Sequence, residues 1–316
     1  MTKEDYIKGI EKSDVRVLSK AITLAESELQ DQFELALSII ESFPSNYKSR
    51  RIGITGSPGA GKSTFINALG MHLLKEDPTL KIAVLSIDPS SSISGGSILG
   101  DKTRMGDLNQ MDQVYIRPSA SGKQLGGLAK NTRLATLLCE AAGYDTILIE
   151  SVGVGQAETE MSKLCDLFCL VLNPGGGDDL QGIKRGIVEM AQLIVVNKND
   201  GASSTLAQNT ARDYQNALQL LGASETDWKP IILTCSSIEK TGLDQVSSTI
   251  DKFFIYLNSD LRKSTRKGQQ KYWLIRHLKD QIVQQINQGE STIDQDLESD
   301  ILPERIARNL AKDFFG

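Results

Sequence analysis

The segment that most constrains the fold lies at residues 51–64. An apolar run predicts a strand at residues 51–55, and the spacing of Phe65, Leu69 and Leu73 predicts a helix after it. The turn between them is rich in glycine and reads Gly56-Ser57-Pro58-Gly59-Ala60-Gly61-Lys62-Ser63-Thr64. A strand, a glycine loop and a helix in this order form a phosphate-binding P-loop. The chain therefore requires an α/β core.

The chemistry of this loop follows from its residue types. Glycines let successive backbone N–H groups converge on phosphate oxygens at the start of a helix. Lys62 can reach the β and γ phosphates, and the Ser63 hydroxyl can ligate Mg²⁺. Both glycines, the lysine and the hydroxyl residue are present in the expected context, which a chance glycine-rich turn would not provide. We expect residues 56–64 to bind a nucleoside triphosphate.

Short apolar runs alternate with helical segments beyond the loop. Continuous apolar strands suit a mostly parallel sheet with helices on both faces, so we predict a P-loop NTPase domain of the G-domain type at residues 49–256. The further strands are expected at residues 82–87, 114–116, 146–149, 168–172, 193–196 and 231–233.

Helical extensions are predicted on both sides of this domain. In residues 1–48, Asp14 can cap a helix that carries Val15, Leu18, Ile22 and Ala25, and a second helix carries Phe33, Leu37 and Ile40. In residues 257–316, the basic run 262–267 is interpreted as a solvated linker. A helical stripe follows it, formed by Trp273, Leu274, Leu278, Ile282 and Ile286, and Pro303 opens a last helix. These helices either pack on the domain or form a dimerisation arm; we predict a homodimer.

Composition limits the partners and the compartment. A net charge of −5 and a pI near 5.3 argue against general nucleic-acid binding, which requires clustered Lys and Arg. The four cysteines form no C-x-x-C pair, so we expect buried thiols rather than disulfides or a zinc site. With no apolar signal segment or long apolar run, we expect no membrane association and a cytoplasmic location, or a mitochondrial one after removal of a transit peptide.

A second motif predicts which base is bound. Asn197-Lys198-Asn199-Asp200 follows an apolar strand and fits the N-K-x-D pattern of guanine-specific P-loop proteins. The Asp200 carboxylate can accept hydrogen bonds from guanine N1–H and N2, which adenine cannot supply, and a buried carboxylate left unpaired is costly. A looser match after the next strand places Ser236, Ser237 and Ile238 beside guanine O6. The sequence therefore predicts GTP and GDP as ligands.

The strand at residues 146–149 leads into Glu150-Ser151-Val152-Gly153, where a G protein usually has D-x-x-G. Glu150 can hold a Mg²⁺-bound water, and the Gly153 N–H can sense the γ-phosphate. Val154 stands where Ras-type proteins place the glutamine that orients water, so we expect slow hydrolysis by the chain alone. Gln156 is either a replacement or an ordinary surface residue.

Two further acidic residues are candidates for the metal or the attacking water. Asp88 ends a strand on the side where phosphates bind, and Asp101 lies in a glycine-rich loop suited to a switch. Either residue could instead cap a turn or a helix.

Several segments resemble the MeaB/ArgK family, the methylmalonyl-CoA mutase-associated GTPases that act as chaperones for adenosylcobalamin-dependent mutases. The resemblance runs from about residue 50 to residue 245. It rests on Asp88-Pro89-Ser90-Ser91, on residues 95–105, on Ile116-Arg117-Pro118-Ser119, on Leu125-Gly126-Gly127, on residues 150–156 and on Asp179-Leu180-Gln181-Gly182-Ile183-Lys184. Residues 119–124 depart from the family's usual proline- and serine-rich version.

The resemblance implies a GTPase that binds an acyl-CoA mutase on a separate chain, gates delivery of adenosylcobalamin and helps remove damaged cofactor. By position, Lys62 and Ser63 serve phosphate and Mg²⁺, whereas Asp88, Asp101 and Glu150 surround the metal and the attacking water. The loop at residues 174–184 is similar to the family's additional switch, with Asp178 and Lys184 as candidate signalling residues. The mutase would then complete a site that is incomplete alone.

Other functions stay open at this point. A nickel metallochaperone GTPase shares the broad fold but should carry a Cys/His metal site, and here His72 and His277 lie far apart in sequence. A P-loop kinase linked to amino-acid transport conflicts with the guanine motif. The last alternative is a nucleotide-dependent dimer that acts by binding alone.

Overall fold

The structure is a computed structural model that describes residues 1–45, 48–87, 105–117, 125–151, 157–175, 185–220 and 227–288. The chain divides into two compact units, Met1–Thr265 and Arg266–Gly316. The first unit holds the sheet and the helices around it, and the boundary falls within the helix α12.

A seven-stranded parallel sheet forms the centre of the first unit, in the order β3-β2-β4-β1-β5-β6-β7. The P-loop strand β1 is central, with β4 and β5 as its neighbours. The strands are β1 Arg50–Thr55, β2 Ile82–Ile87, β3 Val114–Arg117, β4 Thr146–Ser151, β5 Leu167–Leu172, β6 Leu193–Val196 and β7 Ile231–Thr234. The predicted P-loop fold class is confirmed.

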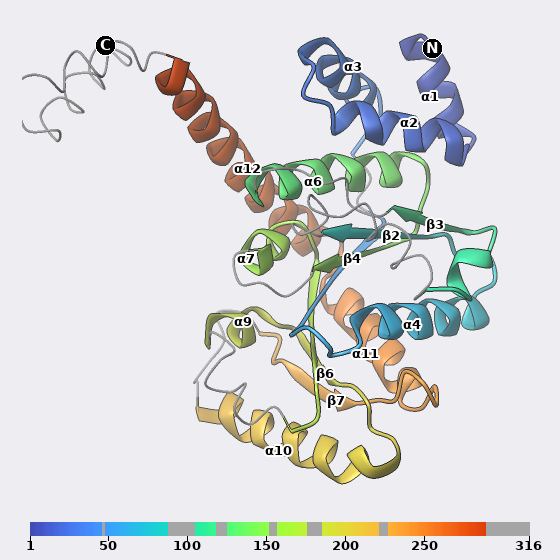
Figure 1. Ribbon diagram of the computed structural model, residues 1–316, viewed down its shortest axis with the longest axis vertical. Helices are drawn as coiled ribbons and strands as arrows, with labels where there is room; N and C mark the ends of the chain where they lie inside the picture. Colours follow the sequence, from blue (N-terminus) through green and yellow to red (C-terminus); the bar gives the residue numbers. More distant parts are fainter. Residues whose placement is uncertain are drawn as a thin grey trace, which may run out of the picture. The chain divides into compact units, whose positions relative to one another are not determined.

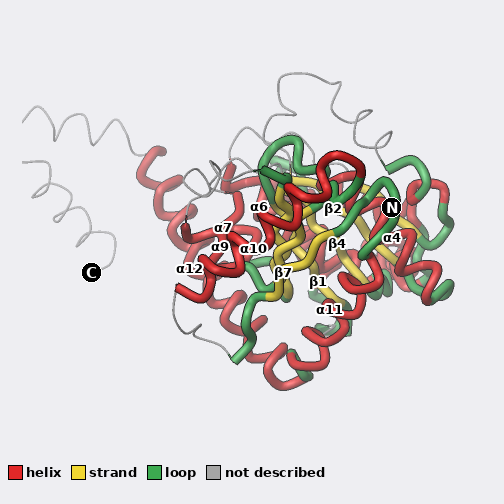
Figure 2. Tube along the Cα trace, turned by 90° about the horizontal axis from the view of Figure 1, so that it is seen from below, coloured by secondary structure: helices red, strands yellow, loops and turns green. Residues whose placement is uncertain are grey.

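Helices cover both faces of this sheet (Figures 1 and 2). Helices α4 and α11 pack on one face, and α6, α7 and α9 contact strands from the other. The helices and 3₁₀ turns are α1 Lys3–Glu11, α2 Val15–Ala25, α3 Gln30–Ile40, α4 Lys62–Glu76, η2 Leu108–Gln110, α6 Leu125–Ala141, α7 Ala157–Ser162, α9 Arg185–Met190, η3 Gly201–Ser203, α10 Ser204–Leu220, α11 Leu243–Tyr256 and α12 Ser259–Gln288.

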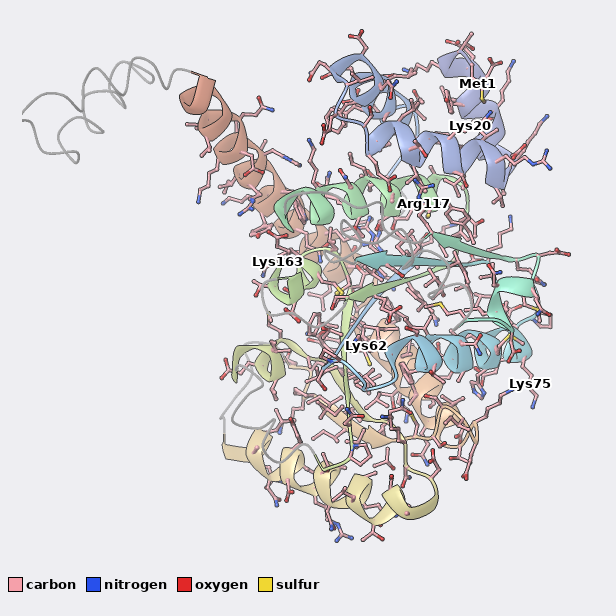
Figure 3. All side chains as sticks on the ribbon, viewed as in Figure 1. Met1, Lys20, Lys62, Lys75, Arg117 and Lys163 are labelled. Carbon is pink, nitrogen blue, oxygen red and sulfur yellow. The ribbon has the colours of Figure 1, made fainter. Side chains whose placement is uncertain are left out.

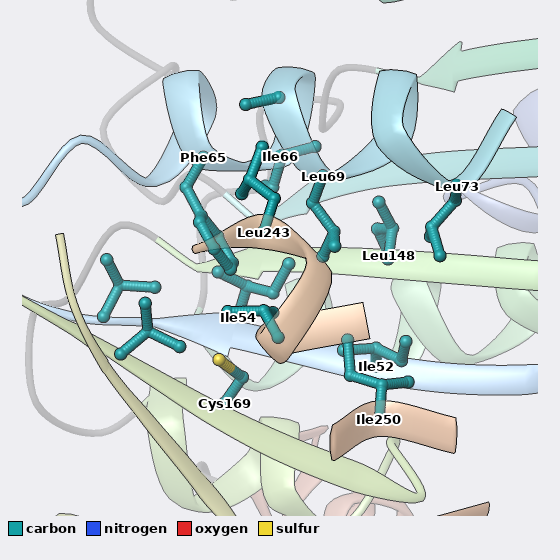
Figure 4. Close-up of a cluster of buried hydrophobic side chains, with 14 of the residues drawn as sticks. Ile52, Ile54, Phe65, Ile66, Leu69, Leu73, Leu148, Cys169, Leu243 and Ile250 are labelled. Carbon is teal, nitrogen blue, oxygen red and sulfur yellow. The ribbon is translucent and has the colours of Figure 1, made fainter. Parts of the chain in front are cut away.

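The helix that follows the P-loop is held by an apolar cluster (Figure 4). Phe65, Ile66 and Leu69 of α4 are at most 1% exposed and pack over Ile52 and Ile54 of β1, with α11 closing the cluster. Burial of each such side chain contributes about 1.5–3 kcal/mol. The strand before the loop and the helix after it are therefore fixed relative to each other.

The N-terminal extension contains three helices, where two were predicted. The predicted start of α2 is confirmed, because Asp14 Oδ1 accepts from Arg16 N at 2.8 Å and Val17 N at 3.2 Å. The missed helix α1 buries only Tyr6 and Ile10, too few apolar residues to show a period. Helices α2 and α3 pack against α6 (Figure 1).

The interpretation of residues 262–267 as a solvated linker is wrong. Helix α12 begins at Ser259 and continues through the basic run, and Arg266 is only 2% exposed. Asn258 Oδ1 accepts from Asp260 N and Leu261 N, which caps the helix, and lysine and arginine are good helix formers. The charges of residues 262–267 had suggested a segment exposed to solvent, but a sequence rich in lysine and arginine can equally well form a helix.

All four cysteines are free and buried, as the sequence predicts. Burial raises the pKa of Cys165 and of Cys235 to about 12, which keeps both as thiols.

Over the described part of the chain, no helix combines the length and the apolar character that a membrane span needs.

Candidate nucleotide-binding site

The predicted site residues that the structure describes gather at one edge of the sheet. The P-loop follows the end of β1, Glu150 lies near the end of β4, and residues 197–200 and 236–238 follow β6 and β7. Parallel strands bring their carboxyl ends to the same edge, which is where open α/β sheets bind ligands. The topology thus assembles segments that lie far apart in sequence.

Two glycines determine the path of the P-loop. Gly56 has a φ of 150°, and a β-carbon there would lie 1.9 Å from the Val171 carbonyl oxygen of β5. Gly61 has a φ of 82°, and its β-carbon would lie 2.8 Å from Asn197 Nδ2. Only glycine fits such positions. The turn delivers the chain into α4 at Lys62, so the helix N-terminus faces the loop.

Lys62 lies at the start of α4 and reaches back into the loop (Figure 3). Its Nζ donates to Gly56 O at 2.8 Å and to Ser57 O at 3.1 Å. Burial lowers the pKa of Lys62, whereas the carboxylates of Glu150 and Glu158 act to raise it. The ammonium group is therefore held inside the loop, in the position from which a P-loop lysine binds phosphate oxygens.

The Ser63 hydroxyl and the Glu150 carboxylate are in direct contact. Ser63 Oγ donates to Glu150 Oε1 at 2.8 Å, and Glu150 pairs with Ile54 across the β1–β4 ladder. Both groups are hard oxygen donors of the kind that Mg²⁺ takes, so they fit that ion. Among the described residues, no group of three or more His, Cys, Asp or Glu side chains is placed to hold a metal ion. The fit therefore rests on one hydroxyl and one carboxylate.

The N-K-x-D segment at residues 197–200 is hydrogen-bonded to the P-loop. Asn197 Nδ2 donates to Ala60 O at 3.0 Å, and Lys198 Nζ donates to Gly59 O at 2.7 Å. Asn197 Oδ1 also accepts from Ser237 N at 3.2 Å and from Ser237 Oγ at 2.7 Å. Asn197 thus joins the P-loop, the end of β6 and the segment after β7 into one unit.

Asp200 lies beside the segment after β7, as the guanine-site prediction requires. Ser236 Oγ donates to Asp200 Oδ2, and Glu239 N donates to Ser236 Oγ at 3.0 Å. Ile238 is 74% exposed, so its side chain is accessible to a ligand. The structure therefore brings Asp200 together with residues 236–238, while their role in binding guanine stays a prediction.

The remaining predicted site residues lie outside the described part of the chain: Asp88, Asp101, Gly153, Asp178 and Lys184. Val154 and Gln156 lie outside it as well. The described segment that leads toward residues 176–184 is anchored, because Gly175 N donates to Thr210 Oγ1 of α10 at 2.9 Å.

Sequence reasoning missed two buried polar residues near the site. Glu158 is 2% exposed and contributes to the electrostatics of Lys62, and Ser86 is 7% exposed near the end of β2. Glu158 had no distinguishing signal, because an acidic residue in the first turn of a helix is common. Ser86 had a weak signal, a hydroxyl two residues before the candidate Asp88.

A parallel sheet with a P-loop after its central strand, and an N-K-x-D segment hydrogen-bonded to that P-loop, is the arrangement of a P-loop GTPase. The chain belongs to the MeaB family: the family described as "Methylmalonyl Co-A mutase-associated GTPase MeaB" matches residues 18–291. The predicted resemblance is therefore confirmed, and the match extends into both helical extensions.

Individual relatives agree with this assignment. The chain is 42% identical over 284 residues to "GTPase ArgK" of Escherichia coli, covering 89% of this chain and 85% of that protein. It is 42% identical over 279 residues to "Methylmalonic aciduria type A homolog, mitochondrial" of Caenorhabditis elegans, covering 84% and 69%. A solved structure titled "Crystal structure of LAO/AO transport system kinase" superimposes with a TM-score of 0.78 at 32% identity, covering 99% of this chain and 98% of that one.

Proposed function

We propose that this protein hydrolyses GTP to GDP and phosphate with Mg²⁺, slowly alone and faster when bound to an adenosylcobalamin-dependent acyl-CoA mutase. In this role it gates delivery of the cofactor to the mutase and protects or reactivates the enzyme. The family's description supports the partner class, since it names methylmalonyl-CoA mutase. The name of the nematode relative also refers to methylmalonic aciduria.

The observation that carries the GTP proposal is the linkage between the two halves of the site. Asn197 and Lys198 donate hydrogen bonds to Ala60 O and Gly59 O, so the base-reading loop and the phosphate loop are rigidly spaced. A ligand that fills both must carry a base and phosphates at that fixed separation. Asp200 then favours guanine, because adenine leaves its carboxylate unpaired.

The residues around the phosphates have separate roles in this proposal. Lys62 binds the β and γ phosphates, and Ser63 and Glu150 hold Mg²⁺, joined by Asp88 and Asp101 through the family resemblance. Bound Mg²⁺ supplies charge neutralisation at the phosphate oxygens. With Val154 in place of a water-orienting glutamine, hydrolysis by the chain alone is slow.

The first test compares GTP with ATP, and the chain alone with the chain plus a purified mutase. We expect GTP to bind well above ATP, and the mutase to accelerate phosphate release. Methylmalonyl-, isobutyryl- and ethylmalonyl-CoA mutases are assayed in parallel, because each is a candidate partner. A preference for ATP would contradict the GTP proposal, and no response to any of the three would contradict the chaperone proposal.

The second test concerns the loop at residues 174–184. Lys184→Ala should leave basal hydrolysis unchanged and reduce stimulation by the mutase, because this loop is the proposed route of signalling. Lys75→Ala is the matched control, since Lys75 is an exposed lysine in the last turn of α4. Equal stimulation of the two variants would remove Lys184 from the proposal.

We also propose that the protein is a homodimer formed through α12. Leu274 is 61% exposed, and Ile275, Leu278 and Val283 on the same helix are also exposed. Such a row of apolar side chains is stabilised when a second copy covers it. Light scattering should give a dimer mass, and the double variant Leu274→Glu, Leu278→Glu should give a monomer that still binds GTP.

One alternative has a specific observation in its favour. The solved structure at TM-score 0.78 has "kinase" in its title, so transfer of the γ-phosphate to an acceptor is the second candidate function. Labelled γ-phosphate separates the two: hydrolysis releases all of the label as inorganic phosphate, whereas a kinase leaves part of it on an acceptor.

A further inference from the structure

Ser86 carries a buried hydroxyl group that the described residues leave unsatisfied. The residue lies one position before the end of β2 and is 7% exposed. Its Oγ makes no hydrogen bond with any part of the chain that the structure describes. Burial of a hydroxyl without a partner costs free energy, and an alanine would fill the same space without that cost. The hydroxyl therefore points to a partner from outside these residues.

The position of Ser86 in the sheet places it at the nucleotide site. In the parallel β2–β4 ladder Ser86 pairs with Glu150, and Val84 pairs with Leu148. Val84 and Leu148 both belong to the apolar cluster under α4 and α11. Side chains alternate along a strand, so Ser86 and Glu150 project from that same face.

The side chains next to Ser86 carry oxygen atoms of the kind that bind Mg²⁺. Glu150 Oε1 accepts a hydrogen bond from Ser63 Oγ at 2.8 Å, which ties the neighbour of Ser86 to the first turn of the P-loop helix. Ser63 and Ser86 are thus both neighbours of Glu150, the first through a hydrogen bond and the second through the β2–β4 register. Mg²⁺ in nucleotide sites usually keeps several water molecules, and these need hydrogen-bond partners in the protein.

We propose that Ser86 is a positioning residue of the magnesium–nucleotide site, whose hydroxyl hydrogen-bonds a water of the Mg²⁺ hydration shell next to Glu150. The inference rests on the proposed function, because it requires Mg²⁺ and a guanine nucleotide to bind here. It assigns Ser86 no contact with the nucleotide itself. The effect of its hydroxyl is on metal affinity, since second-shell partners orient the groups that surround a metal.

The experiment measures metal affinity separately from nucleotide affinity. The GDP complexes of the full-length wild type and of Ser86→Ala are titrated with Mn²⁺, followed by electron paramagnetic resonance, and with Mg²⁺, followed by the rate of release of a fluorescent GDP. We expect Ser86→Ala to weaken metal binding by about 3- to 10-fold, the loss typical of one hydrogen bond. GDP affinity in EDTA should be unchanged. Ser86→Thr, which keeps a hydroxyl, should recover most of the metal affinity.

Ser49→Ala is the matched control. Ser49 is 2% exposed, but its Oγ donates to Tyr144 O at 2.7 Å at the opposite end of the sheet. This variant should lower thermal stability and leave metal affinity unchanged. Equal metal affinity in Ser86→Ala and wild type would overturn the inference, and so would a loss of GDP affinity that persists in EDTA. If the wild type itself showed no metal-dependent nucleotide binding, the proposed function would be the part that fails.

Discussion

The two ends of the sheet both bury polar groups, but they satisfy them differently. At the amino end, the Arg51 guanidinium donates to both oxygens of Glu140 at 2.8 and 2.6 Å, and Arg51 N donates to Asp166 Oδ2 at 3.0 Å. At the carboxyl end, Ser57 Oγ and Ser86 Oγ have no hydrogen-bond partner among the described residues.

This difference separates a structural role from a binding role. Polar groups such as Arg51 and Glu140, which pair with each other away from the proposed site, stabilise one arrangement of the strands. Groups with unused donors and acceptors reduce stability until a ligand satisfies them. The comparison predicts that substitutions at the amino end change unfolding, whereas those at the carboxyl end change binding.

The largest effect is expected at the amino end from Glu140→Gln. This change leaves the buried Arg51 guanidinium without its counter-charge, and losses of this kind cost about 3–5 kcal/mol. The free energy of unfolding in urea measures it. Asp251→Asn is the control, because it breaks the Arg50–Asp251 pair of 2.6 Å, whose side chains are 37% and 50% exposed. That exposed pair should contribute only about 0.2–1 kcal/mol. If Glu140→Gln and Asp251→Asn lowered the free energy of unfolding equally, burial would not explain the difference between the two ion pairs.

The next effect is expected from Lys62→Ala at the carboxyl end. Removing the ammonium group deletes charge-assisted hydrogen bonds to phosphate, so GTP affinity should fall by about 10- to 100-fold or more. Lys75→Ala, at the far end of the same helix, should leave affinity unchanged (Figure 3). Binding of a fluorescent GTP analogue measures both. Retained affinity in Lys62→Ala would refute the assignment of the loop.

A smaller and more selective effect is expected from Asp200→Asn. The amide presents a donor where guanine also presents donors, so the ratio of GTP to ATP affinity should fall by about 10-fold or more. Competition of GTP, ATP and xanthosine triphosphate for the same site measures this ratio. Xanthosine triphosphate should gain, because its base carries an oxygen that accepts from the amide. An unchanged ratio would remove Asp200 from base recognition.

The smallest effect is expected from Tyr115, near the amino end of β3. The ring is 4% exposed, and burial raises the pKa of Tyr115 to about 12, despite a hydrogen bond with Ser19 Oγ. The folded chain then keeps a proton that the unfolded chain releases near pH 10, so stability falls as the pH rises from about 10 to 12.

The loss should reach about 1 kcal/mol per pH unit in that window. Unfolding in urea at several pH values measures it, with Tyr115→Phe as the control that lacks this proton. A difference between the two that does not change between pH 10 and 12 would argue against the raised pKa.

The sequence predicted the strands well, because apolar runs of three to six residues have few alternatives in an α/β chain. The error in β4 has a physical cause. The strand was expected to stop at Ile149, but Glu150 and Ser151 continue the ladder by pairing with Ser86 and Ile87. Polar side chains at a strand end look like the start of a loop in sequence, although the backbone hydrogen bonds do not depend on them.

The candidate site was predicted residue by residue but not as an assembly. The two motifs predict roles for Lys62 and Asp200 because phosphate and guanine demand particular side chains, and these roles stay predictions. The hydrogen bond from Asn197 to Ala60 spans 137 residues and depends on how β1, β5 and β6 line up. Ser86 was missed for the same reason, because only its pairing with Glu150 across the β2–β4 ladder shows that its hydroxyl lies near the proposed site.

Asn197 has a consequence for how such a protein can evolve. Its side chain braces Ala60 and Ser237, whereas Asp200, three residues later, contacts Ser236 at the proposed base position. Within four consecutive residues, support of the P-loop and the proposed selection of the base thus fall to different side chains. A protein of this kind could change the base it accepts by substitution at Asp200 while keeping Asn197. Its P-loop would then keep its structure and its binding of phosphate while the base preference changes.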